Sequence, residues 1–362
     1  SDGRTDFANQ SFTISAWVKP NAVSSDKVIF SYDHTAHTDP HYAIHLRTMS
    51  SGRVTLDYNN GSGSGASVTS GISAVTAGVW QHICATYTSG TQKIYVNGSV
   101  VASGTDAYTI TFYDQEVWIG KGNFGGEFEG LMANVGIWSR ALSASEVESI
   151  QWRGSHSELK DTELTNLVSW YDLDSTSLGS DSLTNGTFEN WASASDANNW
   201  GEYTESTSTV ARSTDSYAGT YAMSFVINAS NSSVGIYQSG AVTAGKKYKV
   251  SFYAKSDSGT PTLGVRTAPN SGNGVSSNTI HESHTLSTTY TQYTTTFDTP
   301  AGDGNLILFR TSGANKTIFI DNVVLEEVVV PDSQGSNEGS ILGATVNTDS
   351  YSGESPFKPR IQ

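Results

Sequence analysis

Basic residues are scarce in this chain of 362 residues. Lys and Arg together number 20 against 35 Asp and Glu, which gives a formal net charge of −15 at pH 7. Nucleic acids and anionic membrane surfaces are themselves polyanionic, and such a charge balance repels them. The sequence also lacks a run of about 18 apolar residues, the length needed to cross a bilayer. We therefore expect neither nucleic-acid binding nor membrane insertion.

Cysteine is nearly absent, since Cys84 is the only one in the chain. A single cysteine excludes an intrachain disulfide. Its neighbours in WQHICATY alternate as in a strand with one buried face, so we expect Cys84 to be a small buried apolar residue. The opening residues SDGRTDFANQ contain no basic segment followed by an apolar one, and the first residue is not Met. We expect this chain to be a processed protein or one piece of a longer polypeptide.

Familiar catalytic motifs are missing as well. There is no serine in a nucleophile elbow, no zinc-binding helix motif and no glycine loop of the phosphate-binding type. Glu127 and Glu129 in GEFEG share a strand face and could in principle serve as the acid and nucleophile of a glycosidase, but a solvated strand edge is the preferred interpretation. We therefore expect no catalytic residue in this chain and no enzyme activity within it.

A histidine-rich stretch, SYDHTAHTDPHYAIH, raises the question of a transition-metal site. Its spacing matches no closed metal site and no cysteine assists, so we prefer a polar loop with ordinary surface histidines. The residues concerned are His34, His37, His41 and His45, with Asp33 and Asp39.

The abundant residues are those of strands and turns. Charged residues make up only 15% of the chain, while Gly, Ser, Thr and Tyr are frequent. Short strand-like runs alternate with turn residues from 12 to 130, with an Asn97-Gly98 hairpin turn among them, and a second series follows the polar run DSTSLGSDS. Ser143 and Glu146 form a capping box for the one good helix signal. The sequence predicts an all-β fold of two antiparallel β-sandwich domains, with almost no helix.

Three blocks of the first region carry a family resemblance: FTISAWVKP, WQHICATYTSGTQKIYVNGSVVA and GLMANVGIWSRALSASEVESI. With them residues 10–174 resemble the laminin-G-like (concanavalin-A-like) jelly roll, and we place this domain at 1–176. We expect Trp17, Trp80 and Trp138 to fill the core between its two curved sheets. Members of this family bind sugars, proteins or calcium, or only build architecture. Ala133 and Asn134 stand where many relatives carry an acidic residue, so we expect no calcium here.

The second region resembles a carbohydrate-binding module of the jelly-roll type, through LTNGTFENW, STDSYAGTYAMSF, GKKYKVSFYAKS and TIFIDNVVLEE. We place this domain at 180–330. The resemblance implies a structural Ca²⁺ that ties the first strand to the last, with Glu189 and Asp321 as carboxylate ligands and carbonyls from Thr187 and from the turn near Asp215. In the alternative interpretation, Glu189 and Asp321 only cap strand ends.

Sugar binding in such modules relies on aromatic rings that stack on a pyranose and on polar groups that bond its hydroxyls. Trp200 and Tyr237 are the preferred candidates, although Trp and Tyr in a sandwich are often core residues. The full set of glycan-binding candidates is Trp200, Tyr237, Trp191, Tyr203, Arg266 and Gln292.

The end of the chain suggests that the second domain is an insertion. LVSWYDLD at 167–174 and the segment 332–346 resemble the continuous strand pair at laminin-G-like borders, here split by the second region. We expect SILGATV to pair beside LVSWYDLD and complete the first domain, and the rest of 331–362 to be an extended connector. The terminal DSYSGESPFKPRIQ resembles structural proteins of tailed bacteriophages, especially marine ones.

These features predict a non-catalytic glycan-binding, adhesive or decoration component of a virion surface, such as a phage tail fibre, adhesin or capsid decoration protein. Its location would be the virion surface or otherwise extracellular. Its partners would be a cell-surface or environmental glycan, other virion or assembly proteins, and further copies of the chain in a homo-oligomer, whose avidity would strengthen weak contacts. Two alternatives stay open: a purely structural assembly protein without ligand, and accessory binding modules of a secreted polysaccharide-degrading enzyme.

Overall fold

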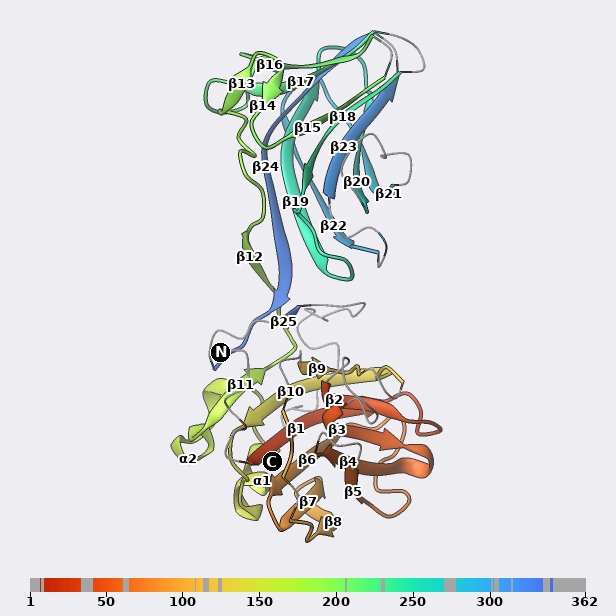
Figure 1. The fold of residues 1–362 in the computed structure, drawn as a ribbon, viewed down its shortest axis with the longest axis vertical. Helices are drawn as coiled ribbons and strands as arrows, with labels where there is room; N and C mark the ends of the chain where they lie inside the picture. Colours follow the sequence, from red (N-terminus) through yellow and green to blue (C-terminus); the bar gives the residue numbers. More distant parts are fainter. Residues whose placement is uncertain are drawn as a thin grey trace, which may run out of the picture. The chain divides into compact units, whose positions relative to one another are not determined.

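The computed structural model describes residues 7, 10–33, 42–60, 65–107, 109–112, 117–122, 126–205, 207–228, 232–269, 278–300, 302, 306–313, 315–334 and 339–340. The chain divides into two compact units: Ser1–Thr176 with Val330–Gly339, and Ser177–Val329. Antiparallel strands dominate both units (Figure 1), which confirms the predicted all-β class with two sandwiches. Among the described residues, no helix is long and apolar enough to cross a membrane.

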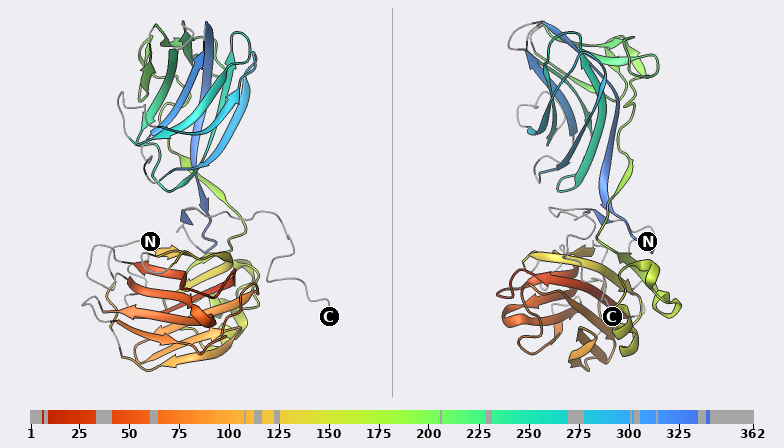
Figure 2. Two further views of the ribbon diagram at one scale, coloured as in Figure 1. Left: turned by 90° about the vertical axis from the view of Figure 1, so that its right-hand side faces the viewer. Right: turned by 180° about the vertical axis from the view of Figure 1, so that it is seen from behind.

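The first unit is built from two antiparallel sheets (Figure 2). A six-stranded sheet has the order β11-β10-β1-β6-β7-β8, and a five-stranded sheet has the order β5-β4-β3-β2-β9. Its strands are β1 Ser11–Pro20, β2 Lys27–Asp33, β3 Tyr42–Met49, β4 Arg53–Asn59, β5 Gly65–Thr69, β6 Gln81–Thr88, β7 Thr91–Val96, β8 Ser99–Gly104, β9 Val117–Ile119, β10 Gly130–Trp138 and β11 Leu167–Tyr171. The predicted hairpin turn joins β7 to β8, where Asn97 and Gly98 have φ values of 48° and 76°.

The tryptophans of the first unit do not lie where the sequence predicted. Trp138 is fully buried, but it packs edge to face against Trp170 in a cluster that also contains Cys84 and helix residues, rather than between the two sheets. Trp17 and Trp80 are only half-buried. Trp17 falls on the helix-covered side of β1, where its indole N–H donates to the carbonyl of Gln151 (3.2 Å). The alternation of β1 and β10 therefore turns the rings of Trp17 and Trp138 away from the sandwich core.

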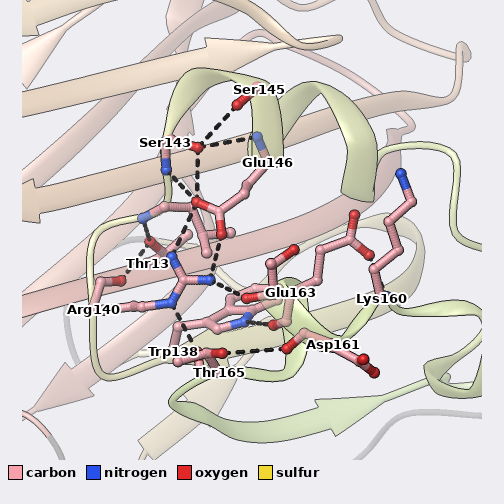
Figure 3. Close-up of polar contacts among 12 residues, drawn as sticks. Thr13, Trp138, Arg140, Ser143, Ser145, Glu146, Lys160, Asp161, Glu163 and Thr165 are labelled. Carbon is pink, nitrogen blue, oxygen red and sulfur yellow. Dashed lines mark hydrogen bonds and ion pairs between the residues drawn. The ribbon is translucent and has the colours of Figure 1, made fainter.

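Helix α1 (Ala144–Ile150) begins at the predicted capping box (Figure 3). Ser143 Oγ accepts from the Glu146 N–H (3.3 Å), and Glu146 Oε2 accepts from the Ser143 N–H (2.8 Å). Two N–H groups of Arg140 donate hydrogen bonds to the same carboxylate (2.7 and 3.0 Å), and these bonds lower the pKa of Glu146 to about 2. The remaining helical segments are short: η1 Ser50–Gly52, η2 His156–Glu158 and α2 Asp161–Leu164.

The second unit has a seven-stranded and a five-stranded sheet. The seven-stranded sheet runs β16-β17-β24-β19-β22, with β12 and β25 also paired to β24, and the five-stranded sheet runs β15-β18-β23-β20-β21. Alternate residues of β19, Tyr248 to Ala254, are buried in the core between them. The strands are β12 Ser177–Asp181, β13 Trp191–Ser193, β14 Asp196–Ala197, β15 Gly201–Thr204, β16 Thr209–Ser213, β17 Ala222–Ile227, β18 Ser232–Ser239, β19 Lys247–Ser256, β20 Thr262–Ala268, β21 Thr279–Thr285, β22 Thr291–Asp298, β23 Leu306–Gly313, β24 Lys316–Val330 and β25 Gly339–Ser340.

The chain leaves the first unit after Thr176 and returns to it at Val330. Beside β11, Asp332 Oδ1 accepts from the Trp170 N–H (2.9 Å), and the Ser333 N–H donates to the Trp170 carbonyl (2.8 Å). The neighbours of LVSWYDLD are therefore residues 332–333. Of the SILGATV run that was expected there, Ser340 belongs to β25, which pairs with β24, and 341–346 lie outside the described residues.

Candidate functional site

The candidate site is one face of the five-stranded sheet in the second unit. Tyr203 and Arg310 are both cross-strand neighbours of Gly235, and Tyr237 and Arg266 are both cross-strand neighbours of Leu308. Because side chains alternate along a strand, these positions share the face that is turned away from the core. We call this surface the tyrosine–arginine face and define it by Tyr203 of β15, Tyr237 of β18, Arg310 of β23 and Arg266 of β20.

The floor of the tyrosine–arginine face is apolar. Leu308 and Ala268 are fully buried, and Tyr203 and Tyr237 pack against them while remaining partly exposed. The Tyr237 ring also lies against the backbone of Gly201, where an added Cβ would come within 2.3 Å of the ring. A glycine is therefore required at 201 for Tyr237 to lie flat on the sheet. Two tyrosine rings over an apolar floor form a surface that suits the apolar side of a sugar ring.

Arg310 is held in a network with its neighbours. Its guanidinium lies 4.4 Å from the centre of the Tyr203 ring and donates to Tyr203 Oη (3.2 Å) and Glu205 Oε1 (3.4 Å). The Tyr203 hydroxyl also donates to Glu205, and this hydrogen bond raises the pKa of Tyr203 and lowers that of Glu205. The network fixes the orientation of the Tyr203 ring.

Arg266 is held differently. Its Nη1 donates to the side-chain oxygen of Asn278 (3.0 Å), and its guanidinium lies close over Gly264, where a Cβ would be 3.1 Å from Nε. The Nε atom is buried and has no hydrogen-bond partner. The pKa of Arg266 is lowered, first by burial and then by the charge of Arg310.

An open depression borders this face. Its volume is about 580 Å³, and its lining residues are 196–201, Tyr237 and Ser239. Trp200, a preferred stacking candidate, is only 5% exposed. Its ring contacts Phe188 and Phe309, and its indole N–H donates to the Asn185 carbonyl (3.0 Å). The structure thus places Trp200 in the core, where it helps to line the depression, rather than on the surface as a platform.

Two other predicted sugar-binding residues lie elsewhere in the second unit. Trp191 of β13 packs against the core and donates its indole N–H to the Phe188 carbonyl. Gln292 of β22 is exposed on the seven-stranded sheet, opposite Tyr253. Neither joins the tyrosine–arginine face, because β13 and β22 do not belong to the five-stranded sheet.

Arg310 was not among the residues predicted from the sequence. It follows the apolar run LILF, which is typical of a buried strand, and only its position two residues after Leu308 places it on the outer face. A charged residue at an alternate position of an apolar strand is the signal that could have identified it.

The predicted calcium ligands Glu189 and Asp321 lie close together around the segment 217–221. Backbone N–H groups of this segment donate to both carboxylates, and Gly219, with a φ of 67°, touches Glu189 where no Cβ would fit. The donors are Tyr217 and Ala218 for Asp321 Oδ2 (2.9 and 3.1 Å), and Thr220 and Tyr221 for Glu189 Oε1 (2.8 and 3.0 Å).

The charges of this carboxylate pair fit a cation. Asp321 is fully buried, and its pKa is raised by burial and further by Glu189. Within the part of the chain that the structure describes, no Lys, Arg or His side chain pairs with either carboxylate. Two adjacent carboxylates with only N–H donors around them suit a hard divalent cation such as Ca²⁺. No third carboxylate, His or Cys joins them among the described residues.

The other predicted calcium ligands, Asp215 and Thr187, are less well placed to bind a cation. The Asp215 carboxylate pairs with Lys255 Nζ (2.6 Å), and its carbonyl accepts from the Tyr290 hydroxyl (2.6 Å). Both the carboxylate and the carbonyl that Asp215 could offer are therefore engaged by other side chains. Thr187 is exposed beside Phe188.

In the first unit, His34, His37, His41 and Asp39 lie outside the described residues, as does the side chain of Asp33. His45 is buried, and burial followed by the charge of Arg47 lowers its pKa to about 4. Glu127 and Glu129 are 73% and 64% exposed and pair with Lys121 and Lys27. These two carboxylates are solvated, as expected, but they precede β10 instead of lying on a strand.

Both units match families of known proteins. Residues 1–148 match the family model of the concanavalin A-like lectin/glucanases superfamily, of the laminin G type, and residues 180–317 match the model of a carbohydrate binding domain. A search of curated proteins finds no match.

Among solved structures, the chain is similar to the enzymatically active domain of tailspike protein 4 of bacteriophage CBA120, at 21% identity over 41% of this chain and 21% of that chain, with a TM-score of 0.32. It is similar to the CBM22-1 xylan-binding domain of Paenibacillus barcinonensis Xyn10C, at 14% identity over 41% of this chain and 95% of that chain, with a TM-score of 0.33. TmCBM61, solved with β-1,4-galactotriose, gives 14% identity over 40% and 97% of the two chains and a TM-score of 0.29.

The matched part of this chain thus spans about a fifth of the tailspike chain. The two family models match the two regions whose resemblance is visible in the sequence. The chain therefore matches a laminin G-like model of the concanavalin A-like superfamily over its first region and a carbohydrate-binding-domain model over its second.

Proposed function

We propose that this chain is a non-catalytic glycan-binding protein and that the tyrosine–arginine face of its second unit holds the sugar. The observation that carries the proposal is the pairing of two partly exposed tyrosine rings over an apolar floor with two guanidinium groups on the same face of one sheet. Tyrosine rings contact the apolar side of a pyranose, while guanidinium N–H groups donate to its hydroxyls. Glu205 beside the face is engaged by Tyr203 and Arg310, so the face offers binding groups rather than an acid and base pair.

Glycan-array screening of the full chain, followed by calorimetry on the best ligand, tests this proposal. We expect Tyr237→Ala to weaken binding about tenfold or more, because the ring supplies stacking area. Tyr217→Ala is the matched control, since Tyr217 is a 43% exposed tyrosine stacked on Tyr253 at another place in the second unit. The absence of any glycan ligand would favour the purely structural alternative, and equal effects of the two substitutions would place the sugar elsewhere.

We also propose that Glu189 and Asp321 hold a structural Ca²⁺. The support is the pair of adjacent carboxylates, one of them fully buried, without a side-chain cation among the described residues. Calcium bound only to the folded state would raise stability by about 2.7 kcal/mol at a concentration 100 times its Kd. The ion would brace the start of the second unit against its last long strand and take no part in chemistry.

Titration of chelator-treated protein with CaCl₂, followed by calorimetry and thermal unfolding, tests the calcium proposal. We expect the wild type to gain several degrees in Tm and the double variant Glu189→Gln, Asp321→Asn to gain nothing. MgCl₂ is the control, since Mg²⁺ requires a stricter octahedral set. A wild type that neither binds calcium nor changes in stability would leave these carboxylates as acceptors for backbone N–H groups alone.

For the biological setting, we propose the surface of a virion, where many copies would give weak glycan contacts their avidity. The support is the resemblance of DSYSGESPFKPRIQ to tailed-phage structural proteins. Locating the chain by structure determination of intact particles tests this setting. Finding it instead linked to a catalytic domain in a longer polypeptide would replace it with the accessory module of a polysaccharide-degrading enzyme, for which the same two domain families are suited.

A further inference from the structure

Two positive charges lie near each other on the tyrosine–arginine face. Arg310 is the cross-strand partner of Gly264, two residues before Arg266 on the same strand, so the two arginines are diagonal neighbours. Diagonal positions on adjacent strands are about 7–8 Å apart, within reach of long side chains. Two like charges at such a distance repel each other, and a partly apolar surface screens them less than bulk water does.

The two charges are compensated unequally. Arg310 has Glu205 as a partner, although that carboxylate also accepts from the Tyr203 hydroxyl and from the Ser233 N–H. Arg266 pairs with no carboxylate among the described residues, and its only acceptor there is the neutral amide of Asn278. The formal net charge of −15 therefore supplies Arg266 with no acidic partner among the described residues.

The burial and charge of Arg266 are unfavourable in the free protein, and this indicates which kind of ligand would stabilise it. Arg266 is half-buried, its Nε has no hydrogen-bond partner, and burial together with Arg310 lowers its pKa. A partly desolvated guanidinium without a counter-charge is unfavourable until an anion pairs with it. Carboxylate and sulfate groups are the acceptors that match the planar fork of arginine, and their charge would also relieve the repulsion between the two arginines.

We infer that the tyrosine–arginine face selects acidic glycans, in which a pyranose stacks on Tyr203 and Tyr237 while its carboxylate or sulfate group pairs with Arg266. This inference rests on the proposed function, because it names the class of sugar that the same face takes. A neutral sugar would use the tyrosine rings and the apolar floor equally well but would leave the Arg266 charge unmatched. The expected ligand is therefore a uronic acid-containing or sulfated polysaccharide.

The test compares matched oligosaccharides on the full chain. Oligogalacturonate and oligoalginate present carboxylates, oligosaccharides of carrageenan present sulfates, and galacto- and xylo-oligosaccharides are the neutral controls. We expect at least one acidic series to bind about tenfold or more tightly than the neutral ones, and this advantage to shrink between about 50 and 500 mM NaCl as salt screens the charges. The acidic series that binds with the higher affinity shows whether the face recognises carboxylate or sulfate groups.

Arg266→Gln is the decisive variant. It removes a charge that has no acidic partner in the described structure, so we expect it to fold. We expect it to lose most of the preference for acidic over neutral glycans, because affinity for acidic glycans loses a charge-assisted pair and falls about tenfold, whereas affinity for neutral glycans loses only a donor to hydroxyls and falls much less. Lys249→Gln is the matched control, since Lys249 is a cation on β19 of the other sheet and should leave the preference unchanged.

The failures are distinguishable. Equal affinity for acidic and neutral glycans, with no effect of Arg266→Gln, would overturn the inference and leave the proposed function standing. An acidic preference that survives Tyr237→Ala and is abolished by inorganic sulfate at equal concentration would also overturn it, because the face would then be a simple anion site. Failure to bind any glycan would remove the proposed function itself.

Discussion

The five-stranded sheets of the two units each carry a partly buried arginine, and the two arginines differ in their acidic partners. On β3 of the first unit, Arg47 alternates with the buried Leu46 and pairs with Asp57 (2.8 Å) and with Asp26. On β20 of the second unit, Arg266 has no acidic partner among the described residues. The first arginine is neutralised by its own chain, whereas the second has no counter-charge among the described residues. The same architecture thus gives one face whose arginine is paired with carboxylates and one whose arginine is not.

The two units also shift the pKa values of ionisable groups in opposite directions. The first buries neutral histidines, since burial lowers the pKa of His82 to about 3 and, together with Arg47, that of His45 to about 4. At the edge of the second unit, burial and then the charge of Asp196 raise the pKa of Glu202 to about 7. Their stabilities should therefore respond to pH in opposite directions.

The largest expected effect is a loss of stability of the first unit at acidic pH. His45 and His82 bind fewer protons in the folded state than in the unfolded state, where their pKa is about 6.5. Their contribution is complete above that value and is lost as the pH falls toward 4. At pH 5 each should cost the first unit about 2 kcal/mol relative to pH 7. Calorimetric scans from pH 7 to 5 should show the first-unit transition moving down, and an unchanged slope in His82→Asn would contradict this cause.

The next largest effect compares the stabilising contributions of Arg47 and Arg266. Asp57→Asn should lower the free energy of unfolding of the first unit by about 3 kcal/mol, because it breaks a buried ion pair that includes Arg47. Arg266→Gln should change that of the second unit by less than about 1 kcal/mol, because no native ion pair is lost. Urea unfolding of both variants measures the difference. Equal costs would mean that the two arginines are equally compensated in the folded protein.

The smallest effect concerns Glu202. Its raised pKa means that the folded state binds more protons, so its contribution is present below about pH 4.5 and is lost as the pH rises through about 7. Glu202 is exposed, and solvent screening keeps the change in Tm of the second unit to about 1 °C. Glu202→Gln should flatten the dependence of that Tm on pH between 5 and 8. A dependence that survives the substitution would assign it to another group.

Local patterns made most of the fold predictable from the sequence. The capping box at Ser143, the Asn97-Gly98 turn and the alternation in β19 depend on residues near each other in sequence, so they could be predicted. The position of the tryptophans could not, because a large aromatic ring suits either side of a strand in this fold. Trp138 faces α1, and Trp200 faces the core of the second unit.

The candidate site was predicted in part for the same reason. Tyr203, Tyr237 and Arg266 were chosen for their chemistry, and the structure brings them together. Arg310 was missed and Gln292 was included, because membership of the face depends on cross-strand register between segments far apart in the chain. Register is set by the packing of whole strands, and no short motif encodes it.

The strand pair β12–β24 gives the second unit ends that meet. Ser177 lies opposite Val329, so the points where the chain enters and leaves are cross-strand neighbours, about 5 Å apart. A domain with such ends behaves as a cassette, because a gene segment coding for it can be removed or exchanged while the host domain needs only a short loop to close the gap. Recombination at these neighbouring ends would replace the second unit in one step and leave the first unit unaltered.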